Sequence, residues 1–469
     1  MELNGIVESL ENKSILVSGA TGFLAKSTTT NTHLFLSFKG LHRVKQSLTE
    51  STLFASFHAV FVEKILRVQP NVKKLFLLLR AADSKSAKQR LNTEVIGKEV
   101  FKVLKQKCGT SLDSFILEKV TPVAGDISYE NLGINDSDLR EQIWSEVDVV
   151  LNFAATTNFE ERYDDALGIN TFGAKNVVDF AKKCKKLQML VHVSTAYVCG
   201  ERPGLILEKA FEMGETLNGT SGLDIEQELK MMEGKLYELR AMEATKEEEK
   251  TAMKELGLKR TIDSLIVGYG KGKLTSFLGS HESVMDLIPG DIVVNAIIVA
   301  MVTHANQPSE NIYQVSSSLK NPMKAPMLRD LGYRYFSKKP WINKEGNPVI
   351  VNKAVLYTSM ASFQNYMAIR YMIPLKGLEL ANTAFCQFFR GVYMDMNMKI
   401  KFVMRMVELY RPYVFFEGVF DDLNSERLRM AVRANEAEAK MFYFDPKCID
   451  WEFYFMNIHL PGVVRYLFK

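Results

Sequence analysis

The residues best suited to chemistry lie in a glycine-rich turn near the start of the chain. The apolar run Ile15–Val17 predicts a short buried strand, and the turn Ser18–Ala25 follows it directly. Gly19 permits a tight turn, Gly22 lets the backbone approach a ligand, and Ala25 stands where a third glycine would allow close helix–strand packing. The amides that open the next helix would then hold a diphosphate. The candidate residues of this predicted dinucleotide site are Gly19, Thr21, Gly22, Phe23, Leu24 and Ala25.

A second candidate, Arg80, ends the apolar run Lys74–Arg80, which predicts the second strand of such a domain. An acid at this strand end binds the ribose 2′-hydroxyl of NAD, whereas a cation suits the 2′-phosphate of NADPH. Arg80 therefore predicts NADPH as the cofactor. It lies 58 positions after Gly22, where about 20 is usual. An insertion over about residues 27–60, rich in Ser and Thr, explains the excess, because removing its 34 residues leaves a spacing of 24.

Three further groups of candidate residues follow the next predicted strands. Asp126 and Ile127 come after the strand Val120–Ala124, where Asp126 is placed to bond an adenine amino group. The strand Val147–Ala155 contains Asn152 and ends in small residues, Ala154 and Ala155, that would let a nicotinamide ribose lie against the backbone. Asn170 begins a predicted helix that runs through Val178. His192, inside the apolar strand Met189–Val193, is interpreted as a hydrogen-bonded core histidine rather than a catalytic one.

These residues need a particular fold to bring them together. Strands and helices alternate from Ile15 to Val193, which predicts an α/β fold with a doubly wound parallel Rossmann sheet. Ligands of such sheets bind at the carboxyl ends of the strands. The segment Asp286–Val302 predicts a core helix. We expect a dinucleotide-binding domain over residues 12–318, a linker over 319–355, and a smaller, mainly helical domain over 356–469 rich in Met and aromatic residues.

Composition narrows the classes of protein that this chain can be. Its 469 residues favour two domains, and 47% hydrophobic with 24% charged residues is ordinary for a globular protein. The five cysteines form no C-x-x-C pair, which argues against a zinc site and for a reducing compartment. We find no secretory signal, no apolar run long enough for a transmembrane helix, and no nucleic-acid motif.

The charge is unevenly distributed along the chain. Residues 319–469 carry 22 Lys or Arg against 14 Asp or Glu, a net charge of +8, whereas residues 1–318 carry 37 against 41, a net charge of −4. This basic C-terminal part suggests contact with something anionic, such as a membrane surface or a phosphate-bearing substrate, although an ordinary solvated surface would also account for it.

The chain also resembles a known family, the plant alcohol-forming fatty acyl-CoA reductases. The resemblance rests on the segments Ile15–Lys26, Phe61–Arg80, Val123–Ile127, Asn152–Asn158, Gly168–Gly173 and Val191–Gly200, and on the C-terminal blocks Met360–Phe363, Pro374–Leu378, Phe420–Leu423 and Phe442–Pro446. It implies an extended short-chain dehydrogenase domain with a male-sterility-type C-terminal domain. The family reduces long-chain fatty acyl-CoA to a primary alcohol with two NADPH, through a retained aldehyde. Members supply wax, suberin or pollen-coat lipid, and many associate with the endoplasmic reticulum.

The resemblance also implies catalytic residues, and here the chain departs from the family. Thr195 aligns with the hydroxyl that orients the substrate carbonyl, and Ser194 is its neighbour. The family's Tyr-x-x-x-Lys helix and the following strand do not appear in this sequence. The segments that flank them in the family, which here end at Arg260 and begin at Thr261, follow one another directly. Tyr269 and Lys273 have the right spacing, but three glycines in five residues disfavour a helix there, so we interpret them as non-catalytic.

Three hypotheses follow. The first is a fatty acyl-CoA reductase. The second is a catalytically inert family member that at most binds NADPH or a partner, which the missing Tyr and Lys favour. The third is another enzyme on this scaffold, such as a sugar-nucleotide epimerase or a hydroxysteroid dehydrogenase, against which the C-terminal blocks argue. A retained intron with a skipped exon, or an error in the gene model, would produce both the insertion and the missing helix.

Overall fold

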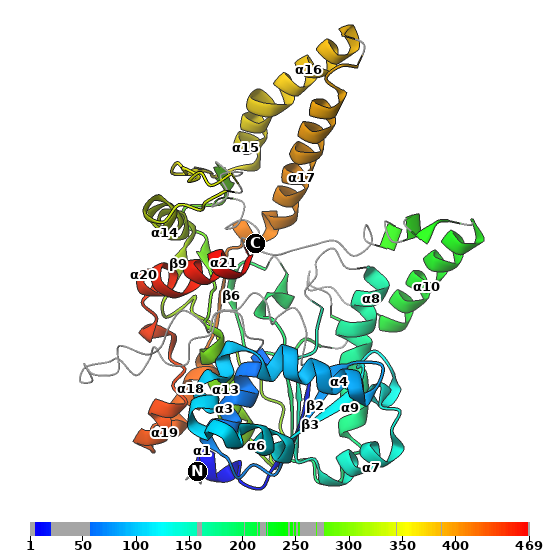
Figure 1. Cartoon of the computed structure of the whole chain (residues 1–469), viewed down its shortest axis with the longest axis vertical. Coiled ribbons are helices and arrows are strands. Elements are labelled where there is room, and N and C mark those ends of the chain that lie inside the picture. The colour runs from blue at the N-terminus through cyan, green and yellow to red at the C-terminus, as the bar shows by residue number, and fades with distance from the viewer. Residues whose placement is uncertain are drawn as a thin grey trace.

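A parallel five-stranded sheet forms the base of the molecule in a computed structural model of the chain (Figure 1). The structure describes residues 5–19, 57–156, 162–200, 202–212, 224–242, 276–343, 345–385 and 387–467, with shorter stretches between residues 214 and 269. The predicted insertion therefore lies mostly outside the described residues, as do Ala20–Ala25 and the junction between Arg260 and Thr261.

The sheet has the strand order β3-β2-β1-β4-β5, and every pair in it is parallel. Its strands are β1 (Ser14–Ser18), β2 (Lys74–Arg80), β3 (Val120–Gly125), β4 (Val149–Asn152) and β5 (Met189–His192). All five lie where the sequence predicted strands. This order is that of a dinucleotide-binding Rossmann sheet up to its fifth strand, so the predicted fold class is confirmed.

Helices cover both faces of the sheet because its central strands are continuous apolar runs, whose successive side chains point to opposite faces. Ile15 and Val17 of β1 pack into the larger core, with α3 (Phe57–Val68) and α13 (Gly290–Thr303). Leu16 points into a second core on the opposite face. That core includes α7 (Ser137–Glu146) and α9 (Gly173–Ala181). The remaining helices around the sheet are α1 (Ile6–Ser9), α4 (Ser84–Arg90), α5 (Lys102–Cys108), α6 (Leu112–Lys119) and α8 (Tyr163–Leu167).

Strand β5 is an edge strand in the part of the chain that the structure describes. It pairs with β4 on one side, and its four residues are only half-buried or exposed, whereas every residue of β1 and β4 is buried. In the predicted fold a sixth strand would continue the sheet beyond β5. That strand is the one missing from the sequence at the junction of Arg260 and Thr261, which lies outside the described residues.

The C-terminal half is built onto the same core. The residues predicted as a linker include helix α14 (Ala325–Lys338), in which Tyr335 and Phe336 are buried. Four further helices follow near the C-terminus: α18 (Leu423–Val432), α19 (Glu436–Met441), α20 (Trp451–Tyr454) and α21 (Leu460–Leu467). The carboxylate of Glu438 in α19 accepts hydrogen bonds from the amides of Ile6 (2.8 Å) and Val7 (2.9 Å), which ties the N-terminal helix to the C-terminal half. The boundaries 12–318, 319–355 and 356–469 stay a prediction.

Short strand pairs join segments that are far apart in the sequence. Strand β6 (Gly204–Ile206) pairs in parallel with β11 (Gly418–Phe420), and β7 (Ser276–Leu278) pairs in parallel with β10 (Val355–Tyr357). Strands β8 (Val284–Met285) and β9 (Met323–Lys324) are antiparallel. These pairs lie above the carboxyl edge of the main sheet.

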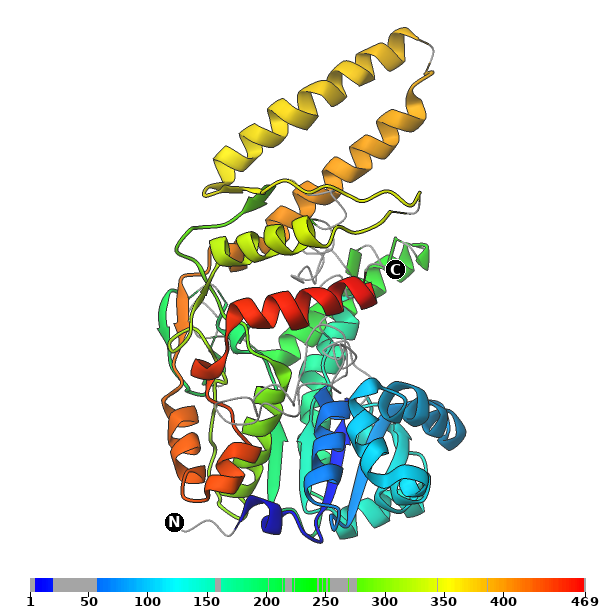
Figure 2. The same ribbon diagram turned by 60° about the vertical axis from the view of Figure 1, so that its left-hand side comes forward.

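Two helical segments project from the body (Figures 1 and 2). One contains α10 (Ile225–Ala241). The other is a hairpin whose first arm comprises α15 (Met360–Met367), the π-helical turn Ala368–Met372 and α16 (Ile373–Ala384), and whose second arm is α17 (Arg390–Val414). In the described part of the chain, none of the helices is both long and apolar enough to cross a bilayer.

Candidate cofactor site at the carboxyl edge of the sheet

Gly19 follows β1 at the carboxyl edge of the sheet, and its position there requires glycine. Its φ is +82°, a backbone conformation that L residues rarely adopt. A Cβ atom at this position would lie 2.5 Å from the amide nitrogen of Ala154 and 2.6 Å from the carbonyl carbon of Phe153. The turn after β1 therefore lies directly against the segment after β4. The other predicted residues of this turn, Thr21, Gly22, Phe23, Leu24 and Ala25, lie outside the described residues.

Asn152, the last residue of β4, joins three strand ends through hydrogen bonds. Its Oδ1 accepts from Ser18 Oγ at the end of β1 and from the amide of Ala154 (3.0 Å). Its Nδ2 lies 3.0 Å from Nδ1 of His192 at the end of β5. Ser18 and Asn152 are both buried. Asn152 thus fixes the backbone that Gly19 contacts, which is a positioning role that the sequence did not specify for it.

Asn170 holds the next part of the segment after β4. It lies in the π-helical turn Gly168–Phe172 between α8 and α9. Its Oδ1 accepts from the amide of Thr156 (2.8 Å), and its Nδ2 donates to the carbonyl of Thr156 (3.1 Å). Ala154 and Ala155, which lie between Asn152 and this clamp, are half-buried. The predicted ribose-contacting residues are therefore held at both ends.

Arg80 and Asp126 occupy the ends of the two strands on the other side of β1. Arg80 ends β2 with its side chain exposed, while its carbonyl accepts from Arg90. Asp126 follows β3, and its carboxylate accepts from the amide of Ser128 (2.9 Å). Ile127 is buried, and its carbonyl accepts from Asn176 of α9 (2.9 Å). Ile127 thus contributes packing and a backbone anchor. The guanidinium of Arg80 is exposed at the edge and has no ion-pair partner among the described residues.

Ser194 and Thr195 come two and three residues after the end of β5, and both side chains are exposed. Thr195 caps the short helix Ala196–Cys199, since its Oγ1 accepts from the amide of Tyr197 at 3.3 Å. Tyr197 points away into a small aromatic cluster, with ring centroids 5.4 Å from Phe416 and 5.2 Å from Phe420. The two predicted hydroxyls are therefore placed by a packed helix, at the same sheet edge as Gly19.

His192 differs from the prediction of a core histidine. It bonds Asn152 as expected of a satisfied ring, but its side chain is exposed because β5 is the last strand of the described sheet. The sequence indicated that the next strand is absent, but we did not expect this to expose His192.

Tyr269, the tyrosine with catalytic spacing that we interpreted as non-catalytic, is buried in the larger core. Its hydroxyl donates to the carbonyl of Asn352 (2.9 Å), and its ring centroid lies 5.5 Å from that of Phe277. Sequence reasoning overlooked the same spacing at Tyr335 and Lys339, at the end of α14, where the ammonium lies 5.8 Å from the tyrosine ring. Tyr335 is also buried in the core.

A buried polar cluster between α3 and α13 was also missed, because its members looked like ordinary helix residues. Lys64 donates to the carbonyl of Met441 (2.6 Å), and Asn295 donates to that of Tyr443 (2.7 Å). Asp291 is buried, and its Oδ1 has no hydrogen-bond partner among the described residues. Burial raises the pKa of Asp291 to about 7 and lowers that of Lys64 to about 8. These contacts hold the C-terminal segment against the sheet domain.

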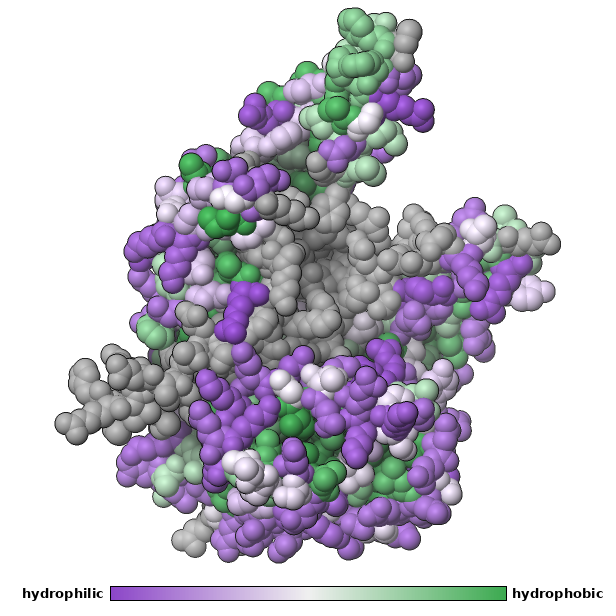
Figure 3. All heavy atoms as spheres, in the orientation of Figure 1, coloured by the Kyte–Doolittle hydropathy of each residue, from purple (hydrophilic) through white to green (hydrophobic). Residues whose placement is uncertain are grey.

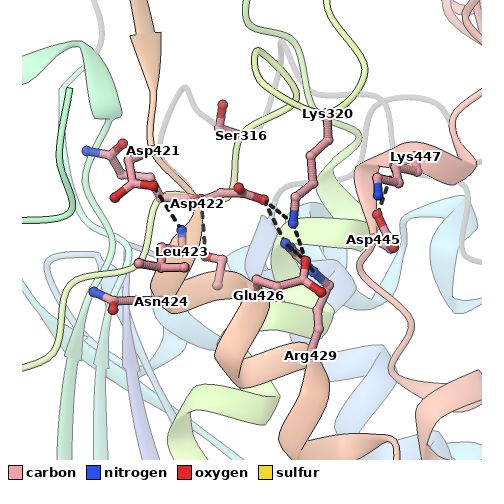
Figure 4. A network of polar contacts seen from close by, with 12 residues as sticks. Ser316, Lys320, Asp421, Asp422, Leu423, Asn424, Glu426, Arg429, Asp445 and Lys447 are labelled. Carbon is pink, nitrogen blue, oxygen red and sulfur yellow. Dashed lines mark hydrogen bonds and ion pairs between the residues drawn. The ribbon is translucent and has the colours of Figure 1, made fainter. Parts of the chain in front are cut away.

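An ion network anchors α18 to the segment before α14 (Figure 4). Arg429 Nη2 lies 2.6 Å from Asp422 Oδ2 and 2.7 Å from Glu426 Oε2. Lys320 Nζ contacts the same two carboxylates, at 3.0 Å from Asp422 Oδ2. The two cations lower the pKa of Glu426 to about 2. Since each charge is paired within the network, we interpret it as structural.

Two family models, both described as "Male sterility protein", match the chain. An NAD-binding model matches residues 58–259, and a second model matches residues 370–469. The first match begins near the end of the predicted insertion and stops one residue before Arg260.

Known relatives match over the full length. The chain is 46% identical to the alcohol-forming fatty acyl-CoA reductase of Simmondsia chinensis, covering 99% of both chains. It is 44% identical to fatty acyl-CoA reductase 1 of Arabidopsis thaliana, covering all of both chains. The first alignment spans 522 positions, whereas this chain has only 469 residues. In at least 53 aligned positions the relative therefore has a residue and this chain has a gap. Such gaps fit a segment missing from this chain.

Among solved structures, the terminal R domain of the myxalamid PKS-NRPS pathway has the same fold. It aligns with a TM-score of 0.52 at 14% identity, covering 98% of this chain and 92% of that one.

Proposed function

The chain belongs to the fatty acyl-CoA reductase family, and from this premise we propose that it reduces a long-chain fatty acyl-CoA to a primary alcohol. The observation that carries the proposal is identity of 44–46% to named reductases over the whole length of both chains. Reduction of the thioester to the alcohol consumes two hydrides and two protons and releases coenzyme A, with the aldehyde as the intermediate.

The chain contains a nicotinamide-nucleotide-binding domain, and we propose that the cofactor is NADPH. The turn at Gly19 leaves no room for a side chain, which suits a backbone that must approach a diphosphate. The exposed guanidinium of Arg80 suits a 2′-phosphate. When bound, this cofactor supplies the hydride that reduces the carbonyl carbon. Asp126 would hold the adenine amino group.

The segment after β4 would hold the nicotinamide ribose. Ala154 and Ala155 present little side chain, and hydrogen bonds from Asn152 and Asn170 fix the backbone on either side of them. Such preorganisation means that little conformational entropy is lost when a ligand binds. The geometry of the site therefore depends on Asn152. At this buried position no other side chain of the same shape offers both a hydrogen-bond donor and an acceptor.

We propose that Thr195, with Ser194 as its neighbour, orients the substrate carbonyl. The hydroxyl of Thr195 is exposed at the sheet edge, where it can donate to an oxygen on which negative charge develops. The family's Tyr-x-x-x-Lys pair has no counterpart on a helix after β5 in the described residues. The proton would therefore have to reach that oxygen from another donor, and a chain without such a donor would be the inert member considered above.

The deciding experiment is an activity assay on the purified full-length chain. The chain is incubated with NADPH and acyl-CoA substrates of increasing length, and the products are measured by gas chromatography. We expect primary alcohol above that of a heat-treated control, and its loss in Thr195→Val. If NADPH binds in a titration but no alcohol or aldehyde forms, the chain is an inert member. If NADPH does not bind either, the proposed cofactor site is wrong.

We also propose that the chain works at a membrane surface on the cytoplasmic face of the endoplasmic reticulum. The support is indirect: the proposed substrate and product carry long apolar chains, and residues 319–469 have a net charge of +8, which favours anionic lipid. Fractionation of cells that express the chain, with and without a salt wash, would test this location.

A further inference from the structure

The tip of the projecting helical hairpin is apolar and uncovered. Leu380 in α16 is 73% exposed, and Phe385 and Phe388 in the turn between the arms are 64% and 81% exposed. Ile373 and Val392 on the two arms are also more than half exposed. Hydrophobic residues accordingly dominate the far end of the hairpin in Figure 3. Exposed apolar residues that gather in this way mark a contact surface.

The base of the hairpin, in contrast, is packed. Phe363 and Met367 of the first arm are buried in a cluster with Leu278 of β7, and side chains of α17 such as Val403 and Val407 pack against them. Among the described residues, only Leu375 and Asn382 are buried in α16. With α17 being 25 residues long, or about 37 Å at 1.5 Å per residue, the tip is held well away from the body.

The turn at the tip is fixed by polar groups that point inward. The buried side chain of Asn382 donates to Gln387 Oε1 (2.7 Å) and accepts from the amide of Phe389 (2.9 Å). The amide of Gln387 donates to the carbonyl of Asn382 (2.8 Å). The described polar groups of the turn thus bond to one another, while the side chains of Phe385 and Phe388 are exposed. An apolar medium requires this arrangement, because it offers no partners for free backbone groups.

The charge of the hairpin points to one kind of partner. Residues 360–414 carry seven Lys or Arg and three Asp or Glu, a net charge of +4. Lys376 lies four residues before Leu380 and Arg390 two residues after Phe388, and both are exposed. Cations beside an apolar tip suit the anionic headgroups that lie above an acyl layer.

We propose that this hairpin tip docks the chain on an anionic lipid bilayer, with Leu380, Phe385 and Phe388 inserted at the interface and Lys376 and Arg390 at the headgroups. The occupant is a bilayer rather than a folded partner because the exposed apolar residues lie on both arms and on the turn, forming a convex end instead of a single stripe. The inference deepens the proposed membrane location but does not rest on reductase activity.

Vesicle binding by the full-length chain tests the docking surface. Phe385→Ser/Phe388→Ser is compared with Leu117→Ser/Met430→Ser, which removes exposed apolar side chains (65% and 56%) from helices α6 and α18, outside the hairpin. We expect the chain to sediment with phosphatidylcholine vesicles that contain phosphatidylserine. The tip variant should bind roughly tenfold more weakly for each aromatic ring removed, and the control variant should bind like the unmodified chain.

Two further arms separate the sources of binding. Lys376→Gln/Arg390→Gln should bind these vesicles roughly fivefold more weakly per charge, while binding to phosphatidylcholine alone stays unchanged. In the variant Phe388→Trp, brominated acyl chains should quench the fluorescence of the new side chain. A hairpin with a merely structural role would show no such quenching. NADPH binding, measured on the same samples, should not change in any variant, so failure here is distinguishable from failure of the proposed function.

The proposal is overturned if the unmodified chain does not bind either vesicle, or if the tip variant binds as tightly as the control. It is also overturned if the unmodified chain is a dimer in sedimentation analysis and the tip variant a monomer, because a second copy would then cover the tip.

Discussion

Substituting Gly19 with alanine tests the central geometry of the candidate site, the close approach of the turn after β1 to the segment after β4. Gly346 supplies the control, because its φ of +81° matches the +82° of Gly19, yet a Cβ there would meet nothing within 4 Å. Both substitutions carry the strain of a left-handed L residue, about 1–2 kcal/mol. Gly19→Ala also places the methyl group 2.5 Å from the amide nitrogen of Ala154.

That contact is too short to persist, so the two segments must separate. Overpacking of this kind costs about 1–3 kcal/mol. We therefore expect Gly346→Ala to lower the free energy of unfolding by about 1–2 kcal/mol and Gly19→Ala by roughly 2–5 kcal/mol. Urea unfolding monitored by fluorescence measures both. NADPH titration should show affinity at least about tenfold weaker for Gly19→Ala, since a displacement of the backbone loosens the diphosphate site, and unchanged for Gly346→Ala. Equal losses of stability and equal affinities in the two variants would refute the reasoning.

Three other predictions concern charge. Replacing Arg80 with Gln should weaken NADPH binding roughly tenfold or more and leave NADH binding almost unchanged, because one charge-assisted bond to the 2′-phosphate is lost; isothermal titration with both nucleotides measures this, and equal weakening of both would contradict it. Asp291 binds its proton more tightly in the folded chain, with a pKa of about 7 against 3.8, so the free energy of unfolding should fall as pH rises from about 4 to 7. Asp291→Asn should remove this pH dependence and raise the free energy of unfolding by up to roughly 4 kcal/mol above pH 7. Thermal melts across pH measure it, and a variant whose stability changes with pH as that of the unmodified chain does would refute the prediction. Arg429→Met should cost up to roughly 3 kcal/mol, because the buried Asp422 loses one of its two cations and keeps only Lys320. Arg433→Met, at an exposed side chain, should cost far less in the same urea titration.

The sheet was predictable because its strands are short apolar runs whose side chains are buried on both faces. Lys74–Arg80 begins and ends as predicted, and β1 and β4 lie within two or three residues of their predicted bounds. The residues that end these strands were predictable for the same reason, since a parallel sheet places every strand end at one edge.

Contacts between distant segments were not predictable from the sequence. The pairing of β6 with β11 joins residues more than 200 positions apart and leaves no local pattern. Asn152 was predicted as a cofactor residue, but its bonds to Ser18 and His192 depend on the register of three strands. Asp291 looked like a favourable acid in the first turn of a helix, and only the packing of the C-terminal segment makes it buried.

Helix α13 determines how the chain can be divided. It packs against β5 and α3 in the sheet domain and also against α18 near the C-terminus, while Glu438 holds the amides of Ile6 and Val7. A stop codon before residue 418 would remove α18 and α19. The side of α13 that packs against α18 would then be exposed to water, and the first helix would lose its hydrogen bonds to Glu438. Every predicted nucleotide-contacting residue lies before position 200, yet a shortened gene product that keeps all of them should neither melt cooperatively nor retain the nucleotide.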